Sequence, residues 1–310
     1  MRLYLTGISG FVGSRLAEAW ADHHELAGCS RQRPDWLEAE HHVLDLAEEP
    51  RHVADRLEAF RPDWVVHCAA VSQPALVGRD PAQARRVNVE AAHWVADWCR
   101  RRGRGLIAFS SDTVYPDAAL TPAPATGWSE RAELDPAHLY GRSKVEMEEA
   151  VRTLLPEALL LRCSLLWGRS RPGQNSFSGW LLAHWREGKP APVFRDNRRH
   201  LLAAGALPAM IDGLRAVMEA GGGPRGALNL GGADYLSRED FALLFCRHLG
   251  LDEGLLRPLD TAEAGLAEAP ARELPLDLGR LRRWLGEPPT TDEWLARDYG
   301  PPHPISTGGA

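Results

Sequence analysis

The sequence predicts an α/β protein built on a doubly wound parallel sheet, with a smaller C-terminal α/β domain. Short apolar segments alternate with longer amphipathic ones at intervals that suit strand–helix–strand units. A glycine-rich stretch follows the first apolar segment directly, as expected where a strand leads into a helix. At 310 residues the chain has room for one large unit and a smaller partner.

The first half of the chain supplies the expected sheet. Each strand is short and apolar, and each helix places apolar residues at intervals of three and four. A proline–aspartate pair introduces the fourth strand, which ends in small residues. The expected strands are residues 3–5, 25–29, 41–44, 64–70, 105–110 and 158–163, and the expected helices end near 20 and 60 or span 81–101 and 137–154.

The alternation loosens after residue 168. Ser237 and Asp240 stand in capping-box positions at the start of a helix. Further helices are expected at 177–187, 203–220 and 237–249, with strands at 191–195 and 227–230. We therefore expect a main domain of residues 1–165 plus about 201–222, a second domain of about 166–200 and 223–298, and a flexible tail at 299–310.

Composition narrows the range of partners. The net charge of −6 provides no basic surface for nucleic acid. No apolar run has transmembrane length and no leader precedes the first strand, so we expect a cytoplasmic protein without a membrane partner. The five cysteines are scattered and form no CxxC pair, which is typical of reduced core residues. The pairs His23-His24 and His41-His42 lack accompanying ligands, so no metal site is predicted.

The glycine-rich stretch has the spacing of a dinucleotide-binding loop. Gly7 would permit the tight turn, Gly10 would let the backbone approach a pyrophosphate, and Gly13 would allow close packing of helix on sheet. Phe11 and Val12 lie in the first turn of the following helix, whose amides and dipole favour phosphate. This context predicts a Rossmann-type nucleotide site.

The end of the second strand indicates which nucleotide binds. An NAD site usually has an acidic residue about 20 residues after the glycine loop, where it holds a ribose hydroxyl. This chain has Ser30 and Arg31 there, and an arginine can bind a 2′-phosphate that a carboxylate would repel. The alternative is an ordinary solvent-facing arginine. We expect NADP(H) in preference to NAD(H).

One predicted helix carries one of the few lysines of the chain, close to a tyrosine. The chain contains 36 basic residues, and Lys144 is one of only two lysines. Tyr140 lies four residues earlier, so both would share one helical face. A neighbouring ammonium should lower the tyrosine pKa toward neutrality. Ser111, at the end of the strand over 105–110, would reach the same edge of the sheet and could bond a carbonyl oxygen.

Together these pieces resemble the extended short-chain dehydrogenase/reductases. Within that superfamily, the chain is most similar to the dTDP-4-dehydrorhamnose reductases and related sugar-nucleotide reductases, and the resemblance spans nearly the whole chain. The matching segments are TGISGFVG at 6–13, VVHCAA at 65–70, FSSDTVYPD at 109–117, YGRSK at 140–144 and LRCSLLWG at 161–168.

The resemblance implies roles around the cofactor. Asp45 and Leu46 would flank the adenine. Ala69 and Ala70 would line the ribose side of the cofactor. Asn88 would be a structural or relay residue at the edge of the cofactor site.

The resemblance also implies the chemistry. Ser111 would polarise the substrate carbonyl, Tyr140 would be the acid, and Lys144 would tune it while binding the nicotinamide ribose. Asn175 would contact the substrate diphosphate. The segment 195–200 departs from the loop that relatives have here, and its Arg195 and Arg199 would either clamp a diphosphate or be surface charge.

The function expected from this set is NADPH-dependent reduction of a keto-sugar nucleotide. A sugar-nucleotide epimerase or dehydratase is the alternative enzyme, although such enzymes recycle NAD and Ser30-Arg31 does not suit NAD. A non-catalytic, NADP-binding regulatory subunit is the alternative from another class. Trp180 and Trp185, on one predicted helix, would support either substrate binding or a homodimer.

Overall fold

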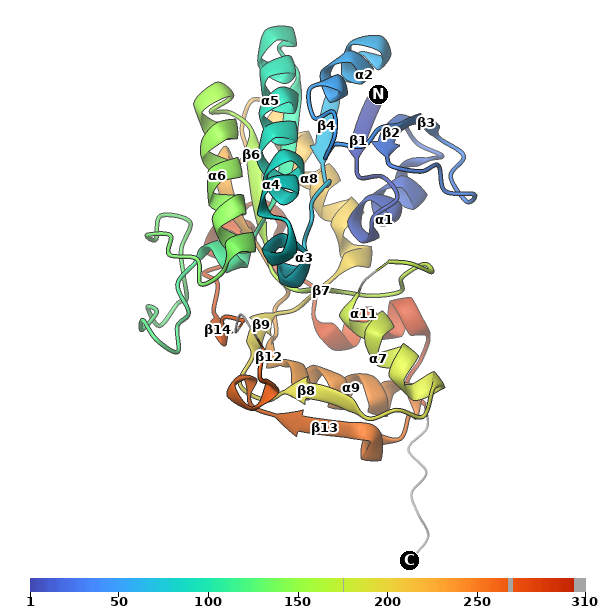
Figure 1. The fold of residues 1–310 in the computed structure, drawn as a ribbon, viewed down its shortest axis with the longest axis vertical. Coiled ribbons are helices and arrows are strands. Elements are labelled where there is room, and N and C mark those ends of the chain that lie inside the picture. The colour runs from blue at the N-terminus through green and yellow to red at the C-terminus, as the bar shows by residue number, and fades with distance from the viewer. Residues whose placement is uncertain (175, 267–269, 304–310) are drawn as a thin grey trace, which may run out of the picture.

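A parallel sheet of seven strands forms the centre of the protein (Figure 1). The computed structural model describes residues 1–174, 176–266 and 270–303. In order across the sheet, the strands are β11 (Gly226–Leu230), β6 (Leu159–Cys163), β5 (Gly105–Ser111), β4 (Trp64–His67), β1 (Arg2–Thr6), β2 (Glu25–Ser30) and β3 (Glu40–Val43). The predicted fold class is confirmed.

The chain winds outward from β1 in both directions. It first runs through β2 to β3, then returns to β4 on the other side of β1 and continues through β5, β6 and β11. Because every pairing in this sheet is parallel, all carboxyl ends lie along one edge. The winding reverses between β1 and β4, which is where such sheets bind ligands.

Helices cover both faces of the sheet. One buried cluster includes Leu16, Leu207 and Leu281, and the other includes Leu57, Val95 and Met147. These residues place three helices on each face. The helices are α1 (Phe11–Trp20), α8 (Leu207–Glu219) and α10 (Gly279–Leu285) on the first, and α2 (His52–Phe60), α5 (Ala91–Arg102) and α6 (Leu139–Leu154) on the second.

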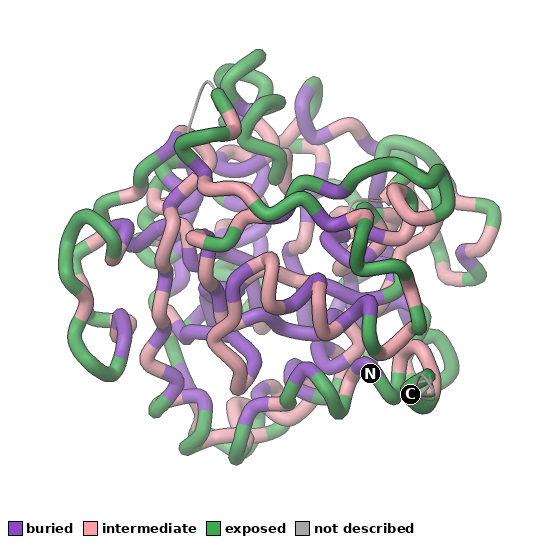
Figure 2. Tube along the Cα trace, turned by 90° about the horizontal axis from the view of Figure 1, so that it is seen from below, coloured by how far each residue is buried: buried purple, intermediate pink, exposed green. Residues whose placement is uncertain are grey.

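A third buried cluster lies below the carboxyl edge of the sheet, in the lower part of Figure 1. It forms around Trp167, Phe241 and Phe245. Figure 2 shows the buried parts of the chain in purple, mostly inside exposed segments in green. The predicted domain boundaries stay a prediction. The helices here are α7 (Phe177–Arg186), α9 (Arg238–Leu249) and α11 (Thr291–Tyr299), and the strands are β8 (Ala191–Phe194) with β13 (Leu256–Leu259), β9 (Arg198–His200) with β12 (Tyr235–Ser237) and β14 (Glu273–Leu274), and β7 (Leu166–Trp167) with β10 (Leu202–Ala203).

Several local predictions need correction. The helix expected over 81–101 is α4 (Pro81–Arg85) and α5, joined by a π-helical turn, η1 (Arg86–Glu90). Another short helix, α3 (Pro74–Arg79), follows the strand expected to reach residue 70, which ends at His67. Asn88 lies in the π turn, a distortion that often accompanies functional sites.

The end of the chain is partly described. Residues 304–310 of the predicted tail lie outside the described residues, whereas Tyr299 ends α11. The amide of His303 donates to the carbonyl of His248 in α9. Among the described residues, none of the helices combines the length and apolarity that crossing a membrane requires.

Candidate active site

The glycine loop lies at the reversal point between β1 and β4. Gly7 has φ +67°, and a Cβ there would lie 2.8 Å from the Cα of Ala69 after β4, so a larger residue would force the loop away. The amides of Gly7 and Ile8 both donate to the carbonyl of Cys29, at 2.8 and 3.2 Å. The loop is therefore held between the ends of β2 and β4.

The N-terminus of α1 fits a phosphate group. Gly10 is exposed at the N-cap, and no side chain in the described ranges caps this end. Amides of the first turn are therefore available to an anion, and the helix dipole favours it. Gly13 is buried in the helix, and Phe11 and Val12 pack against the core below the loop. The residues present suit a dinucleotide pyrophosphate.

Ser30 and Arg31 differ in whether their side chains are bonded to other protein groups. The Ser30 hydroxyl donates to the carbonyl of Gln32 at 2.9 Å and bonds the His41 ring at 2.8 Å. Arg31 is exposed beside it, and in the part of the chain that the structure describes its guanidinium has no ion pair. Arg31 is thus the better placed of the two to receive a ligand phosphate.

The residues expected around the adenine and ribose lie on the loops after β3 and β4. Asp45 accepts a hydrogen bond from the amide of Ala47 at 2.8 Å, and Leu46 is buried. Ala69 donates its amide to the hydroxyl of Thr6, while Ala70 is half-buried. Both loops are at the carboxyl edge of the sheet, next to the glycine loop.

Asn88 connects three segments. Its side-chain oxygen accepts from the amide of Val71 at 2.8 Å, and its nitrogen donates to the Ser143 hydroxyl at 2.9 Å. The side chain is fully buried. These bonds tie the π turn to the loop after β4 and to α6, so the contacts of Asn88 are structural.

Ser111 and Tyr140 meet at the carboxyl edge. The Ser111 hydroxyl is near enough to the Tyr140 hydroxyl to lower its pKa. The approach of α6 depends on Gly141, because a Cβ at this position would collide with the carbonyl oxygen of Thr113. His138 caps the helix by accepting from the amide of Gly141 at 3.1 Å.

Lys144 lies beneath the tyrosine ring. Its ammonium nitrogen is 5.9 Å from the Tyr140 ring centroid and donates to the carbonyl of Phe109 at 2.8 Å. The side chain is buried. The structure therefore brings together the three residues predicted for catalysis, Ser111, Tyr140 and Lys144.

The pKa of Tyr140 is shifted in the direction opposite to the one that the sequence predicted. Burial raises the pKa of Tyr140 above its ordinary value, and the carboxylate of Asp112 and the thiol of Cys163 raise it further, while the Ser111 hydrogen bond lowers it. The predicted fall toward neutrality is wrong in direction, because desolvation outweighs the ammonium beneath the ring. Burial lowers the pKa of Lys144 to about 8.

Asp112 is a residue of the site that the sequence analysis did not predict. It connects Ser111 of the catalytic set to Arg199 in the lower part of the molecule. One carboxylate oxygen accepts from Ser111 at 3.2 Å, and the other accepts from Ser164 at 2.9 Å and lies 3.5 Å from Nε of Arg199. Burial raises the pKa of this carboxyl group, and Arg199 opposes the rise. An aspartate after a strand-end serine could equally be a turn former, so the sequence carried no clear signal.

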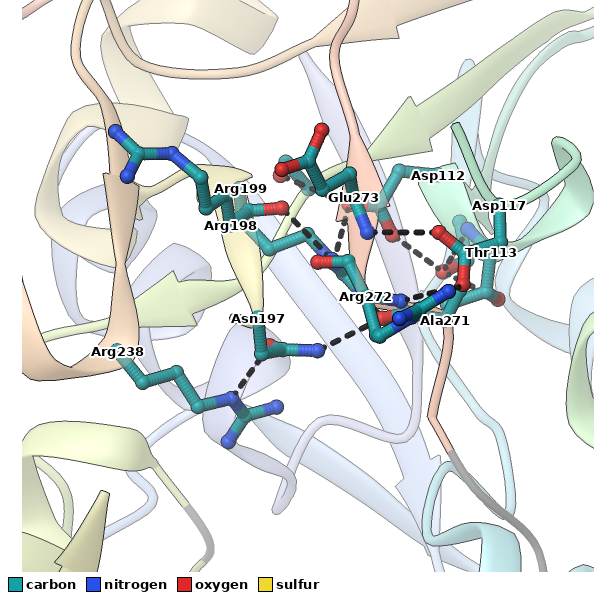
Figure 3. A network of polar contacts seen from close by, with 12 residues as sticks. Asp112, Thr113, Asp117, Asn197, Arg198, Arg199, Arg238, Ala271, Arg272 and Glu273 are labelled. Atoms are coloured by element: carbon teal, nitrogen blue, oxygen red, sulfur yellow. Dashed lines mark hydrogen bonds and ion pairs between the residues drawn. The ribbon is translucent and has the colours of Figure 1, made fainter. Parts of the chain in front are cut away.

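Arg199 is bonded to protein groups (Figure 3). Its terminal nitrogens donate to the carbonyls of Arg198 and Arg272, at 2.7 and 3.0 Å, and of Ala271 at 2.5 Å. Arg195 is exposed and pairs with Asp260 at 3.2 Å. The two arginines are not arranged as one clamp, and substrate binding by either stays a prediction. Asn175 lies outside the described residues.

A second unpredicted contact reaches the glycine loop from the loop after β7. The side-chain amide of Gln174 donates to the carbonyl of Ser9 and to the hydroxyl of Ser14, both at 2.9 Å. The loop after Trp167 therefore closes over the start of α1. In the described ranges, no group of three or more histidines, cysteines or acidic residues could hold a metal ion.

Comparison with known proteins places this arrangement in a family. Residues 1–293 match the family described as RmlD substrate binding domain. The chain belongs to this family. The predicted membership of the extended short-chain dehydrogenase/reductases is confirmed, as is the prediction of an NAD(P)-dependent oxidoreductase.

Three similar proteins represent the matches. A probable dTDP-4,6-dihydroxy-2-methyloxan-3-one 4-ketoreductase of Streptomyces antibioticus is 32% identical over 259 residues, which are 83% of this chain and 80% of the relative. Methionine adenosyltransferase 2 subunit beta of Bos taurus is 26% identical over 298 residues, 90% of this chain and 81% of that protein. The solved dTDP-4-dehydrorhamnose reductase of Bacillus anthracis in complex with NADP has a TM-score of 0.78 at 21% identity, covering 96% of this chain and 98% of its own.

Proposed function

We propose that the protein reduces the carbonyl group of a keto-sugar nucleotide with NADPH. The observation that carries the proposal is the placement of Tyr140 above the Lys144 ammonium and near Ser111, at the same carboxyl edge of the sheet as the glycine loop. A tyrosine whose pKa lies above its ordinary value is protonated at neutral pH. It can therefore donate a proton, as carbonyl reduction requires. The Streptomyces relative is itself named a probable ketoreductase of a dTDP-sugar.

The mechanism divides the work among three side chains. A bound nicotinamide would supply the hydride, with its electron pair, to the carbonyl carbon. Ser111 would hold the carbonyl oxygen, and Tyr140 would give its hydroxyl proton to that oxygen as negative charge develops, yielding an alcohol. Lys144, buried below the ring, would stabilise the phenolate left on Tyr140 until solvent returns a proton.

The chain suits NADP better than NAD. Arg31 is exposed at the end of β2, and none of the described carboxylates pairs with it, so it can meet a 2′-phosphate. The glycine loop and the uncapped start of α1 would hold the pyrophosphate. The remaining cofactor contacts that we propose are Ser30, Asp45, Leu46, Ala69 and Ala70 around the adenine and ribose, and Asn88 would support them from the edge of the cofactor site through its bond to Val71.

The test is oxidation of NADPH and of NADH in the presence of a panel of 4-keto nucleotide sugars. We expect turnover with at least one substrate, a preference for NADPH, and loss of turnover in Tyr140→Phe with NADPH binding retained. Turnover that survives Tyr140→Phe would contradict the role of Tyr140. NAD that copurifies and does not exchange would instead indicate an epimerase.

A non-catalytic regulatory subunit is the second candidate. The bovine relative is named as the beta subunit of methionine adenosyltransferase 2, and it matches most of this chain. The same panel separates the two functions. Tight NADPH binding without oxidation on any keto substrate would favour the regulatory function.

A further inference from the structure

One face of α6 carries a third functional group beyond the predicted pair. Tyr140, Lys144 and Glu148 follow one another at intervals of four residues, so they lie in one row along the helix. Glu148 is fully buried. A carboxylate in the interior needs partners, because desolvation penalises its charge.

Glu148 has two buried partners on the neighbouring strands. Arg162 of β6 is 2% exposed, and its Nη2 and Nε lie 2.7 and 3.0 Å from the two carboxylate oxygens. Ser110 of β5 donates its hydroxyl to Oε1 of Glu148 at 2.5 Å. The carboxylate is therefore held by a bidentate guanidinium and a hydroxyl, the arrangement that compensates a buried charge best.

The same network holds the strand-end segment that carries Ser111. Arg162 also donates to the hydroxyl of Tyr115 at 2.8 Å, and Tyr115 donates to Asn229 of β11 at 2.7 Å. Ser110 and Tyr115 lie on either side of Ser111 along the chain. Both ends of this segment are thus attached, through Glu148 and Arg162, to the helix face that carries Tyr140.

The charge environment of Lys144 depends on few groups. His67 in β4 and Cys68 just after it face the ammonium, the carbonyl of Phe109 accepts from it, and Tyr140 and Glu148 flank it on α6. Burial lowers the pKa of Lys144, and the charges of Cys68 and Glu148 oppose that effect. Burial also raises the pKa of the Cys68 thiol, so the opposing charge comes from the Glu148 carboxylate that Arg162 holds.

We propose that Glu148 and Arg162 are a positioning pair for the reaction, which holds Tyr140 against Ser111 and keeps Lys144 as an ammonium. This inference rests on the proposed function of Tyr140 and Lys144. Neither Glu148 nor Arg162 touches the reacting atoms. Arg162 gives the carboxylate a permanent counter-charge, because an arginine stays protonated at every working pH.

The experiment is the pH dependence of kcat/KM for the reductase reaction. In the unaltered enzyme, we expect kcat/KM to fall as pH rises through the Lys144 pKa near 8. Glu148→Gln keeps the shape of the side chain but removes its charge, so this alkaline limb should move down by about one pH unit. Glu146→Gln is the matched control, since Glu146 is exposed on the same helix and pairs with Arg85. An alkaline limb of Glu148→Gln at the unaltered position would overturn the inference.

A second variant covers a failure of Glu148→Gln to fold. Glu148→Gln combined with Arg162→Gln removes both buried charges, which is better tolerated than leaving one unpaired. It should fold and show the alkaline limb lowered by less than in Glu148→Gln alone, because the lost guanidinium charge offsets part of the lost carboxylate charge. A limb at the unaltered position would count against the inference. If none of the keto substrates supports NADPH oxidation by the unaltered protein, the proposed function is wrong, and this outcome is distinct from a failure of the inference about Glu148 and Arg162. The pH dependence of NADPH binding then provides the comparison, with the same shift expected and an identical profile contradicting it.

Discussion

The catalytic edge and the region below it are built in different ways. At the catalytic edge, each functional group follows directly from a short motif: a glycine loop after β1, a serine ending β5, and a tyrosine and lysine one turn apart on α6. Below it, Asn197 and Arg199 both donate to the carbonyl of Ala271, which lies more than 70 residues further along the chain (Figure 3). The first region is specified locally, and the second depends on tertiary contacts.

The two regions use arginine side chains differently. Arg31, at the catalytic edge, is exposed and available to a ligand, whereas Arg199 is buried and holds three backbone carbonyls and Asp112. Arg199 therefore stabilises the structure around the site. The predictions below separate these two uses.

The largest effect is expected at the catalytic edge. Tyr140→Phe removes the proton donor and little else, so kcat with a keto substrate should fall by about a thousandfold. NADPH affinity, measured by fluorescence titration, should stay within about twofold, because the ring remains above Lys144. A loss of NADPH binding equal to the loss of kcat would show that Tyr140 serves the cofactor and not the proton transfer.

In the lower region, Arg199→Met should act on stability. It leaves three carbonyls and the Asp112 carboxylate without their buried donor, so the free energy of unfolding in urea should fall by about 3 kcal/mol. Arg195→Met is the control, because an exposed pair with Asp260 contributes below about 1 kcal/mol. Equal losses in both variants would remove the distinction between the two arginines.

Cofactor choice gives a smaller effect at the catalytic edge. Arg31→Ala should lower kcat/KM for NADPH by about 10- to 100-fold, as expected for lost bonds to a charged group, and change that for NADH little. Arg33→Ala is the control, since Arg33 donates to the carbonyl of Leu37. A parallel decrease for both cofactors in Arg31→Ala would count against recognition of the 2′-phosphate.

The smallest effect is expected for a helix cap in the lower region. The Ser237 hydroxyl caps α9 by accepting from the amide of Asp240 at 2.9 Å, and the Asp240 carboxylate accepts from the amide of Ser237 at 3.0 Å. Ser237→Ala should lower the free energy of unfolding by about 1 kcal/mol. Thr290→Ala, which removes a longer capping bond of 3.4 Å, should cost less in the same urea titration. The reverse order would contradict the assignment of a full capping box to α9.

Sequence reasoning predicted the elements that local physics specifies. The strands of the sheet, the Ser237 capping box and the helical spacing of Tyr140 and Lys144 all follow from short-range preferences, and the structure contains them. The direction of the Tyr140 pKa was missed, because it depends on burial and on Asp112, which a spacing does not reveal.

The buried pair could be predicted only in part. Arg162 interrupts an otherwise apolar strand, and a charge in such a strand indicates a buried partner. Its partner could not be chosen, because Glu146, Glu148 and Glu149 lie together on α6 and only the packed helix shows which one faces inward. Likewise, the partners of Arg199 lie 72 residues or more away along the chain, apart from its neighbour Arg198.

The most direct test of the proposed reaction follows the hydrogen itself. The protein would be incubated with NADPH deuterated at the transferable C4 position and a 4-keto nucleotide sugar, and the product examined by mass spectrometry and NMR. We predict one deuterium on the former carbonyl carbon for each NADPH oxidised, with incorporation about a thousandfold slower in Tyr140→Phe. A product that carries hydrogen from solvent at that carbon, or bound NADPH that transfers no deuterium to any keto sugar, would contradict a reductase.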